Sequence, residues 1–300
     1  MLDCSVVIPT FYPGDIINKL FLSLPAVKEI IVFDNGNDKK LKNETLDNFR
    51  NIKYINTGDI GLAKTFNFAL NNTVSQNIFI TQPDVELYNN CIENLLDAKK
   101  KYENAAILAP LVFEDNKYSI FDHYQLKIYK SKKLKKKIQS KKNNIIPSGD
   151  FCVEAIPATA MLIDRNKVIN IGGWDNYYYT YLEDIDLSYN VRKNNYEIIK
   201  ISSAKVNHVG FGSHEKKNFS RMNKKRIFNF TKSTLYFDHK YKNNFDFWSV
   251  ALGKLVIFTM KFLLNLFLIR LNKINLNFYR LKAYYYFFIL EKLGKKGNKQ

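Results

Sequence analysis

Cysteine is scarce in this sequence, with three residues in 300: Cys4, Cys91 and Cys152. They are far apart and odd in number, which fits a reducing compartment and no zinc site. The opening stretch MLDCSVVIPT makes a poor secretory signal, because an acid at Asp3 precedes a short apolar run that ends at Pro9. We interpret this stretch as a first core strand and expect a cytoplasmic protein.

Acidic residues are few relative to basic ones, since 28 Asp and Glu stand against 46 Lys and Arg, for a net charge of +18. This excess predicts an anionic partner: a nucleic acid, a membrane surface or a phosphorylated substrate. Apolar residues make up 46% of the chain and aromatic residues 15%, which is a high aromatic share. The length fits one large domain, or a domain with an appendage, and a sizeable core.

Residues 1–110 alternate between apolar runs of strand length and segments with helical spacing. Strands are expected at 4–10, 29–35, 52–57 and 76–84, and helices at 17–24 and 61–73. Near-continuous Val, Ile and Phe in strands joined by helices predict a doubly wound, parallel α/β sheet covered on both faces. Such sheets bind ligands beyond the carboxyl ends of their strands, where Asp34, Asp59 and Asp84 fall.

The middle of the chain is less regular. Residues 127–142 contain nine lysines and no acid, which predicts a surface loop. Order returns with a strand near 158–163, a short helix, a loop at Gly172–Gly173 and then an acidic helix. A further strand is expected at 204–213, ending in a glycine-rich turn.

The composition changes again from about residue 245, where the chain becomes apolar, aromatic and basic. Residues 252–300 contain ten Lys and Arg and one acid. The segment 252–271 is long enough to cross a bilayer, but Lys254 and Lys261 interrupt it, and a lysine near the centre of a span costs about 2.5–3.5 kcal/mol. We therefore expect a helix in the membrane interface, with lysines toward anionic headgroups; a spanning helix and an internal core helix are the alternatives.

Three strand-end residues could carry chemistry, and each also has an ordinary structural explanation. Asp84 could hold a divalent cation that bridges two phosphates, because Mg²⁺ and Mn²⁺ prefer oxygen ligands, or it could simply follow Pro83 in a turn. Asp34 could accept a hydrogen bond from a base, or belong to an Asn-Gly turn. Gly61 could expose N–H groups to a phosphate at a helix start, which Asp59 could equally cap.

Three carboxylates, Glu183, Asp184 and Asp186, lie within four residues and follow Trp174 and a run of tyrosines. At helical spacing Glu183 and Asp186 share a face, while Asp184 points about 100° away. Acids gain from a helix N-terminus whatever their role, but this does not explain the rings before them, which suit a sugar. A carboxylate there could serve as a general base. His208 could be a further metal or phosphate ligand, although a lone histidine after a strand is more often structural.

In this order the segments resemble the family 2 glycosyltransferases with a GT-A fold, over roughly residues 4–240 and most closely the bacterial branch that includes many rhamnosyltransferases. The matching segments are SVVIPTFYPGD, VFDNGND, GDIGLAKTFN, QPDVEL in place of a metal-binding Asp-x-Asp, and GGWDNYYYTYLEDIDL, which is the most specific. The resemblance implies a GT-A domain at 1–240, built on a doubly wound mixed sheet, with a mainly parallel nucleotide-sugar half at 1–87 and an acceptor half at 88–240. A basic, aromatic, membrane-associating helical tail follows at 241–300.

The resemblance also implies roles for individual residues. Asp184 would be the catalytic base, with Glu183 as the alternative. Contacts to the nucleotide sugar would come from Pro9, Thr10, Asp34, Asn35, Gly61, Asn67 and Asp84. Contacts to the acceptor would come from Trp174, Asp175 and Tyr181, and a divalent metal, Mn²⁺ or Mg²⁺, would bind Asp84 and His208.

Some positions depart from the family pattern. Gln82 replaces the first acid of the metal motif, which leaves Asp84 as its only acid. Asn190 stands where an Arg commonly follows the acidic motif, and Asn195 replaces a usual Gly, a change that is tolerable because Asn accepts a left-handed backbone. Gln82 and Asn190 raise the alternative of a catalytically inactive scaffold.

The resemblance implies an inverting enzyme that moves a sugar such as rhamnose from a UDP- or dTDP-sugar to a lipid-linked glycan such as O-antigen or capsule. The positive charge would serve the diphosphates and the anionic inner face of the cell membrane, where a peripheral protein is expected. A sugar nucleotidyltransferase is disfavoured, because no glycine-rich loop with an Arg/Lys pair lies near the first strand. A nucleic-acid-binding protein is disfavoured, because aromatic and basic residues are not interleaved on a sheet.

Overall fold

The computed structural model describes residues 1–48, 52–114, 117–119, 121–126, 146–209 and 219–290. The loop predicted at 127–142 and the glycine-rich turn predicted after His208 lie outside these ranges. The chain forms two compact units. Unit 1 comprises Met1–Tyr177 and Glu183–Glu215, and unit 2 comprises Tyr178–Leu182 and Lys216–Gln300.

Unit 1 is built on a mixed sheet with the strand order β3-β2-β1-β4-β9-β6-β10-β5. Its strands are β1 (Leu2–Thr10), β2 (Val27–Asp34), β3 (Ile52–Asn56), β4 (Asn77–Thr81), β5 (Val85–Leu87), β6 (Ala105–Glu114), β9 (Ala160–Asp164) and β10 (Glu197–His208). Two short strands, β7 (Lys117–Tyr118) and β8 (Phe151–Cys152), pair with β6 and β10. The predicted α/β sheet with a mainly parallel N-terminal half is confirmed, and β9 enters it antiparallel to both neighbours.

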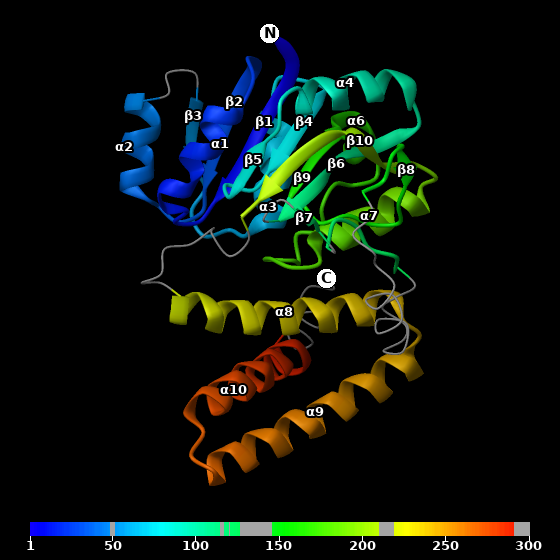
Figure 1. Ribbon diagram of the computed structural model, residues 1–300. Helices are drawn as coiled ribbons and strands as arrows, with labels where there is room; N and C mark the ends of the chain where they lie inside the picture. Colours follow the sequence, from blue (N-terminus) through cyan, green and yellow to red (C-terminus); the bar gives the residue numbers. More distant parts are fainter. Residues whose placement is uncertain (49–51, 115–116, 120, 127–145, 210–218, 291–300) are drawn as a thin grey trace, which may run out of the picture. The chain divides into compact units, whose positions relative to one another are not determined.

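Helices cover both faces of this sheet (Figure 1). On one face, α1 (Ile17–Ser23) and α4 (Cys91–Lys101) form one apolar cluster with alternate residues of β1, which are Cys4, Val6 and Ile8. On the other face lie α3 (Leu62–Asn72) and α6 (Arg165–Asn170), joined where Arg165 Nε donates to the Leu70 carbonyl at 2.6 Å. The remaining helices of unit 1 are α2 (Lys39–Asn48), a short turn at Gly14–Ile16, and α7 (Glu183–Lys193), which packs on β10.

The carboxyl ends of the parallel strands share one edge of the sheet. Because β9 runs antiparallel to both β4 and β6, these two strands share one direction, and β10, which pairs parallel with β6, shares it too. The residues that end the strands at this edge are Thr10, Asp34, Asn56, Thr81, Glu114 and His208. Polar groups from distant parts of the sequence therefore meet there.

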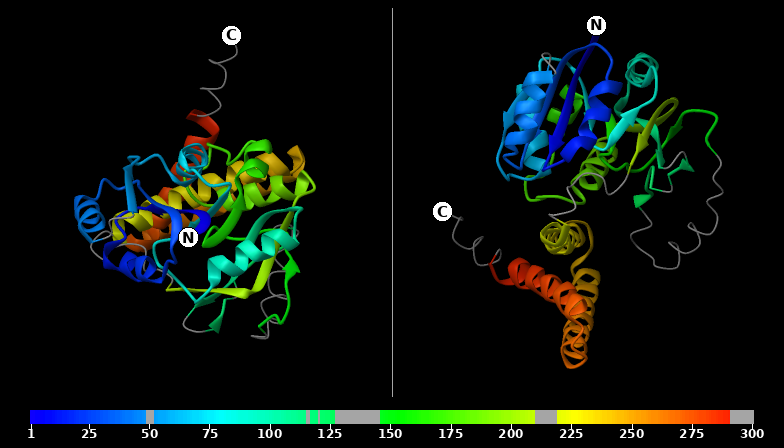
Figure 2. Two further views of the ribbon diagram at one scale, coloured as in Figure 1. Left: turned by 90° about the horizontal axis from the view of Figure 1, so that it is seen from above. Right: turned by 60° about the vertical axis from the view of Figure 1, so that its left-hand side comes forward.

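Unit 2 is helical. It contains α8 (Phe219–Tyr241), α9 (Asn244–Phe267), α10 (Leu271–Tyr285) and a final turn at Tyr286–Leu290. Figure 2 shows α9 and α10 as a hairpin, and α10 packs against both α8 and α9. The predicted boundary between residues 240 and 241 falls in the last turn of α8, whereas the contacts group all of α8 with the tail.

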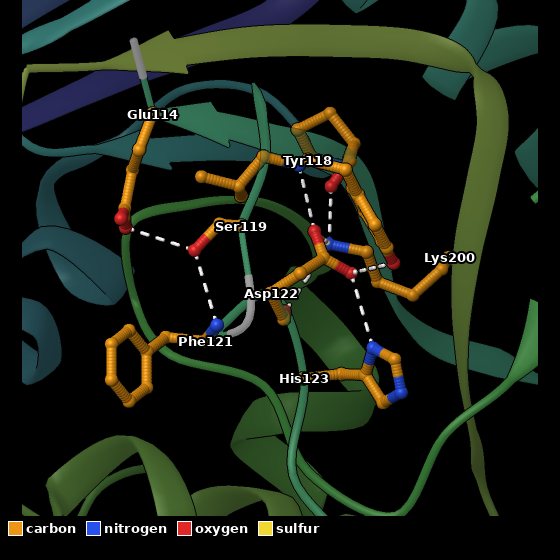
Figure 3. A network of polar contacts seen from close by, with 9 residues as sticks. Glu114, Tyr118, Ser119, Phe121, Asp122, His123 and Lys200 are labelled. Atoms are coloured by element: carbon orange, nitrogen blue, oxygen red, sulfur yellow. Dashed lines mark hydrogen bonds and ion pairs between the residues drawn. The ribbon is translucent and has the colours of Figure 1, made fainter. Parts of the chain in front are cut away.

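A buried ion pair ties the turn around β7 to the sheet of unit 1 (Figure 3). The Nζ of Lys200 lies 2.6 Å from Oδ1 of Asp122, and both side chains are buried. Asp122 also accepts hydrogen bonds from the Val112 N–H at 2.7 Å and the Tyr118 hydroxyl at 2.9 Å, and lies 3.2 Å from His123 Nδ1. Burial alone would raise the pKa of Asp122, but the Lys200 ammonium and these hydrogen bonds hold it below its ordinary value.

We predict that Lys200→Met destabilises the protein by about 3–5 kcal/mol, because it leaves the Asp122 carboxylate buried without its cation. Urea unfolding of the purified variant measures this. Lys205→Met is the matched control, since Lys205 is an exposed lysine on the same strand. Combining Lys200→Met with Asp122→Asn should recover part of the loss. Unfolding of Lys200→Met at the same urea concentration as Lys205→Met would contradict a stabilising ion pair.

Candidate active site

Asp34 organises the loop that follows β2. Its side chain is buried and accepts hydrogen bonds from the N–H groups of Gly36 at 2.7 Å and Asp38 at 2.6 Å, from the Tyr54 hydroxyl and, at 3.5 Å, from the Thr10 hydroxyl. A carboxylate offers about four lone-pair sites, so these four donors use its acceptor capacity. In this conformation the Asp34 carboxylate shapes the loop, and its acceptance of a hydrogen bond from a base stays a prediction.

An aromatic ring that sequence reasoning missed lies over the same loop. Tyr12 follows β1 with a left-handed backbone, φ 50°, and its ring is half-buried. A Cβ added to Gly36 would lie 3.0 Å from this ring and 3.2 Å from Asp34 Oδ1, so a larger residue there would displace one of these side chains. Tyr12 thus offers a ring at the carboxyl edge, beside Pro9 and Thr10, which pair with the end of β2. The left-handed backbone that aims this ring left no signal in the sequence.

Asn35 and Gly61 connect this loop to α3. The Thr65 hydroxyl donates to Asn35 Oδ1 at 2.9 Å and to the Gly61 carbonyl at 2.8 Å. Gly61 is the N-cap of α3 with φ 84° and makes no side-chain capping hydrogen bond. The capping of α3 by Asp59 stays a prediction. The N–H groups of the first turn of α3 remain the best-placed backbone donors for an anion on this side.

Asn67 was predicted to contact the nucleotide sugar, but its side chain holds the loop after α6. Its Nδ2 donates to the Trp174 carbonyl at 2.7 Å, and its Oδ1 accepts from the Trp174 N–H at 2.9 Å. A Cβ on Gly173 would lie 2.5 Å from that Oδ1, which explains a glycine there. Trp174 itself is 2% exposed and packs on Phe66, with ring centroids 5.0 Å apart. The prediction that Trp174 contacts the acceptor is corrected, because its ring belongs to the core.

Asp84 and His208, predicted as metal ligands from positions far apart in the sequence, are neighbours. His208 Nε2 lies 3.5 Å from Asp84 Oδ2, and His208 Nδ1 lies 3.8 Å from Glu114 Oε1. Antiparallel pairing of β5 with β10 sets this arrangement by placing His208 opposite Val85. Burial lowers the pKa of His208, but the carboxylates of Asp84 and Glu114 outweigh it and raise that pKa above its ordinary value.

A buried carboxylate beside an imidazole is a donor set that fits Mn²⁺. Across the described ranges, no group of three or more His, Cys, Asp and Glu side chains is arranged to hold a metal ion. A metal held by Asp84 and His208 would therefore need oxygen ligands from substrate or water to complete its coordination.

The acidic segment forms the first turn of α7, as predicted. Glu183 and Asp186 are buried on one face, and Asp184 is half-buried. Asp184 Oδ2 accepts from the Ala158 N–H at 3.1 Å, directly before β9 begins, so α7 starts at the carboxyl edge of the sheet. Asn190, which departs from the family pattern, donates to Asp186 Oδ2 at 3.3 Å.

Glu183 and Asp184 form a pair of carboxyl groups with little stabilisation of their charge. Burial raises the pKa of Glu183 well above its ordinary value, and the Asp184 charge adds to this shift. Burial also raises the pKa of Asp184, although the N–H groups of Ala158 and Ile185 oppose it by hydrogen bonding. Glu183 Oε2 is buried without a hydrogen-bond partner among the described residues. A carboxyl group with a raised pKa is suited to exchange a proton near neutral pH.

Two other residues predicted to contact the acceptor have mainly local partners. Asp175 Oδ1 accepts from the Tyr177 N–H at 3.0 Å and so closes a turn. Tyr181 belongs to unit 2, where its ring lies edge-on to Phe230 with centroids 5.7 Å apart. Of the predicted residues, those at 9, 10, 34, 35, 61, 84, 183, 184 and 208 are on or next to strand ends and helix starts at one edge of unit 1.

Comparison with known proteins shows similarity to glycosyltransferases, both in a family model and in a curated relative. The sequence model of the family described as Glycosyl transferase family 2 matches residues 5–161, which is more than half of the chain. An N-acetylglucosaminyl-diphospho-decaprenol L-rhamnosyltransferase of Mycobacterium tuberculosis is 22% identical over 241 residues, covering 68% of this chain and 75% of the relative.

Two solved structures have a similar fold. GalNAc-T7, crystallised with UDP, GalNAc and Mn²⁺, matches with a TM-score of 0.54 and 15% identity over 77% of this chain. S. aureus TarS in complex with UDP-GlcNAc matches with a TM-score of 0.51 and 15% identity over 78% of this chain. The chain spans 50% of the length of the GalNAc-T7 structure and 66% of the TarS structure.

We predict that Glu183→Gln stabilises the protein, and that the gain grows with pH. Because the folded-state pKa of Glu183 is raised, wild-type stability is lost as the pH rises through that pKa, whereas Gln has no proton to lose. The gain should be about 1 kcal/mol or more at neutral pH and should shrink toward about pH 4. Thermal unfolding across this range measures it, with exposed Glu103→Gln as control. A pH-independent difference would contradict the raised pKa.

Proposed function

The chain belongs to glycosyl transferase family 2 and has the GT-A fold, and from this premise we propose that it is an inverting enzyme that uses a nucleoside-diphosphate sugar. The observation that carries the proposal is the Glu183–Asp184 pair, which begins α7 at the sheet edge where Asp84 and His208 meet. The printed name of the mycobacterial relative includes a diphospho-decaprenol and an L-rhamnosyl group. It supports a lipid-linked acceptor and makes rhamnose the first sugar to test.

We assign the nucleotide to the loops that follow β1 and β2. The half-buried ring of Tyr12, over the loop shaped by Asp34, suits a uracil or thymine ring. The first turn of α3, with Gly61 at its N-cap, suits a phosphate oxygen. Pro9, Thr10 and Asn35 contribute by fixing these loops. The ligands named for the neighbours, UDP and UDP-GlcNAc, support a UDP- or dTDP-sugar here.

Asp84 and His208 would hold a divalent cation, Mn²⁺ or Mg²⁺, against the donor diphosphate. When bound, such a cation neutralises the charge that develops on the departing nucleoside diphosphate. The Mn²⁺ in the GalNAc-T7 crystal supports this use of the fold. Asp84 supplies a buried carboxylate oxygen, and β5 and β10 keep His208 beside it.

Asp184 would act as the general base. It takes the proton from the attacking acceptor hydroxyl as the bond from that oxygen to the anomeric carbon forms and the bond to the diphosphate breaks. A single displacement of this kind inverts the anomeric carbon through an oxocarbenium-like transition state, by analogy with glycoside hydrolysis. Glu183, the more deeply buried partner, keeps a proton and hence limits the negative charge beside Asp184. Asp175 and Tyr181 remain our candidates for acceptor contacts.

Unit 2 would attach the enzyme to the cytoplasmic face of the membrane. Among the described residues, α9 is the one helix long and apolar enough to cross a membrane. Most of its apolar side chains are exposed, which argues against the core-helix alternative. The turn between α9 and α10 exposes Phe267 by 84%, Ile269 by 78% and Leu271 by 67%, with exposed Arg270 and Lys273 beside them. Apolar and basic side chains together suit an anionic membrane interface.

The central test is a titration of the protein with UDP- and dTDP-sugars, with and without Mn²⁺, followed by a transfer assay with the donor that binds. We predict that Asp184→Asn lowers transfer by at least about 100-fold, because general-base help is lost, while donor affinity stays within about twofold. Asp97→Asn, an exposed acid on α4, is the control. Near-normal turnover of Asp184→Asn would exclude Asp184 as the base. No response to any nucleotide sugar would favour the scaffold or nucleic-acid alternatives.

We predict that the protein binds vesicles containing anionic lipid more tightly than neutral vesicles, and that Phe267→Asp with Ile269→Asp weakens binding by about 10-fold or more. Removing two apolar side chains from lipid forfeits at least about 1.5 kcal/mol each. Flotation with vesicles measures this. Leu22→Asp on α1 is the matched control, since Leu22 is 80% exposed. If the Phe267→Asp, Ile269→Asp variant binds vesicles as tightly as Leu22→Asp, the membrane contact lies elsewhere. If alkaline carbonate does not extract the protein from the vesicles, a membrane-spanning α9 is favoured.

A further inference from the structure

The chain leaves unit 1 and returns to it immediately before the carboxylate pair. Residues Tyr178–Leu182, which we call the strap, have unit 1 on both sides in the sequence but make their contacts within unit 2. The next residue, Glu183, is the first of α7 and belongs to unit 1 again. The strap is therefore the stretch of backbone that joins the helical unit directly to the Glu183–Asp184 pair.

One face of α8 holds the strap. The Ser233 hydroxyl donates to the Thr180 carbonyl at 2.9 Å. The Tyr178 ring, which is fully buried, lies edge-on to Tyr236 with centroids 5.2 Å apart. Phe230 makes the same kind of contact with Tyr181, as described above. The three α8 residues, 230, 233 and 236, are spaced by three and share a helix face, so the strap is held along two turns.

The strap ends in an unfavourable backbone conformation. Tyr181 has φ 69° and Leu182 has φ 67°, so two consecutive residues with side chains are left-handed. Such residues persist only where surrounding contacts hold them, and they concentrate at functional sites. Here the contacts come from α8 and from burial of Leu182, which is 8% exposed. The strained residues directly precede Glu183, so relaxation of the strap would re-aim the first turn of α7.

We propose that Phe230, Ser233 and Tyr236 of α8 are positioning residues for the reaction: by holding the strap they set the orientation of Glu183 and Asp184. On the unit 1 side, the Asp184 carboxylate accepts hydrogen bonds from the N–H groups of Ala158 and Ile185. The inference rests on the proposed role of Asp184 as the base. It adds that a helix of unit 2, outside the catalytic sheet, controls that base.

The test is Phe230→Ala combined with Ser233→Ala, which removes one ring contact and the hydrogen bond while Tyr236 stays in place. Phe230 is 52% exposed, so its loss should spare the fold. Thr234→Ala is the matched control, because its hydroxyl bonds to the carbonyl of Phe230 within α8 and does not contact the strap. We expect kcat to fall about 10-fold and the donor KM to stay within about twofold, because misplacing a catalytic group lowers turnover rather than donor binding.

Hydrogen exchange provides a readout independent of turnover. In the double variant, the amides of the first turn of α7 should exchange faster than in wild type and in Thr234→Ala, while those of β1 and β4 should be unchanged. Faster exchange in the strap alone, with α7 and kcat as in Thr234→Ala, would overturn the inference. If Asp184→Asn is inactive while the separate double variant is fully active, the role of α8 and the strap is rejected but the role of Asp184 stands. An active Asp184→Asn rejects the proposed base itself.

Discussion

The common direction of β1, β2, β3, β4, β6 and β10 is the constraint on which the site depends. Parallel strands end at the same edge of a sheet, so residues from distant parts of the sequence are delivered to one place. Asp34, Asp84 and His208 arrive there at or just after strand ends. The antiparallel strand β9 starts where its neighbours end, and the Ala158 N–H before it holds Asp184 at that edge.

Unit 1 buries carboxylates in two different ways. Asp122 has Lys200 and several hydrogen bonds, so its charge is stabilised and its pKa is lowered. Among the described residues no ion pair involves Glu183 or Asp184, and burial raises the pKa of both. The first arrangement secures a turn on the sheet, and the second leaves carboxyl groups ready to take up a proton. Burying the second pair costs stability, as is common where a site is built for reactivity.

Unit 2 combines two features that belong to one proposed task. Its hairpin of α9 and α10 exposes apolar and basic side chains that suit the surface of a membrane holding a lipid-linked acceptor. Its helix α8 packs against α10 and holds the strap that leads to the carboxylate pair. Attachment to the membrane and orientation of the base would therefore depend on the same helical unit.

The sequence alone determined the α/β class, most strands and helices of residues 1–84, and the shared helix face of Glu183 and Asp186, because these follow from local periodicity. It also indicated Asp84 and His208 as candidate metal ligands, although the two residues lie far apart in the sequence. Only the tertiary structure decided that Trp174 is core, that the acceptor sites of Asp34 are already filled, and that the strap belongs with α8. Each of these depends on partners far away in the sequence, and periodicity carries no information about which distant side chain completes a contact.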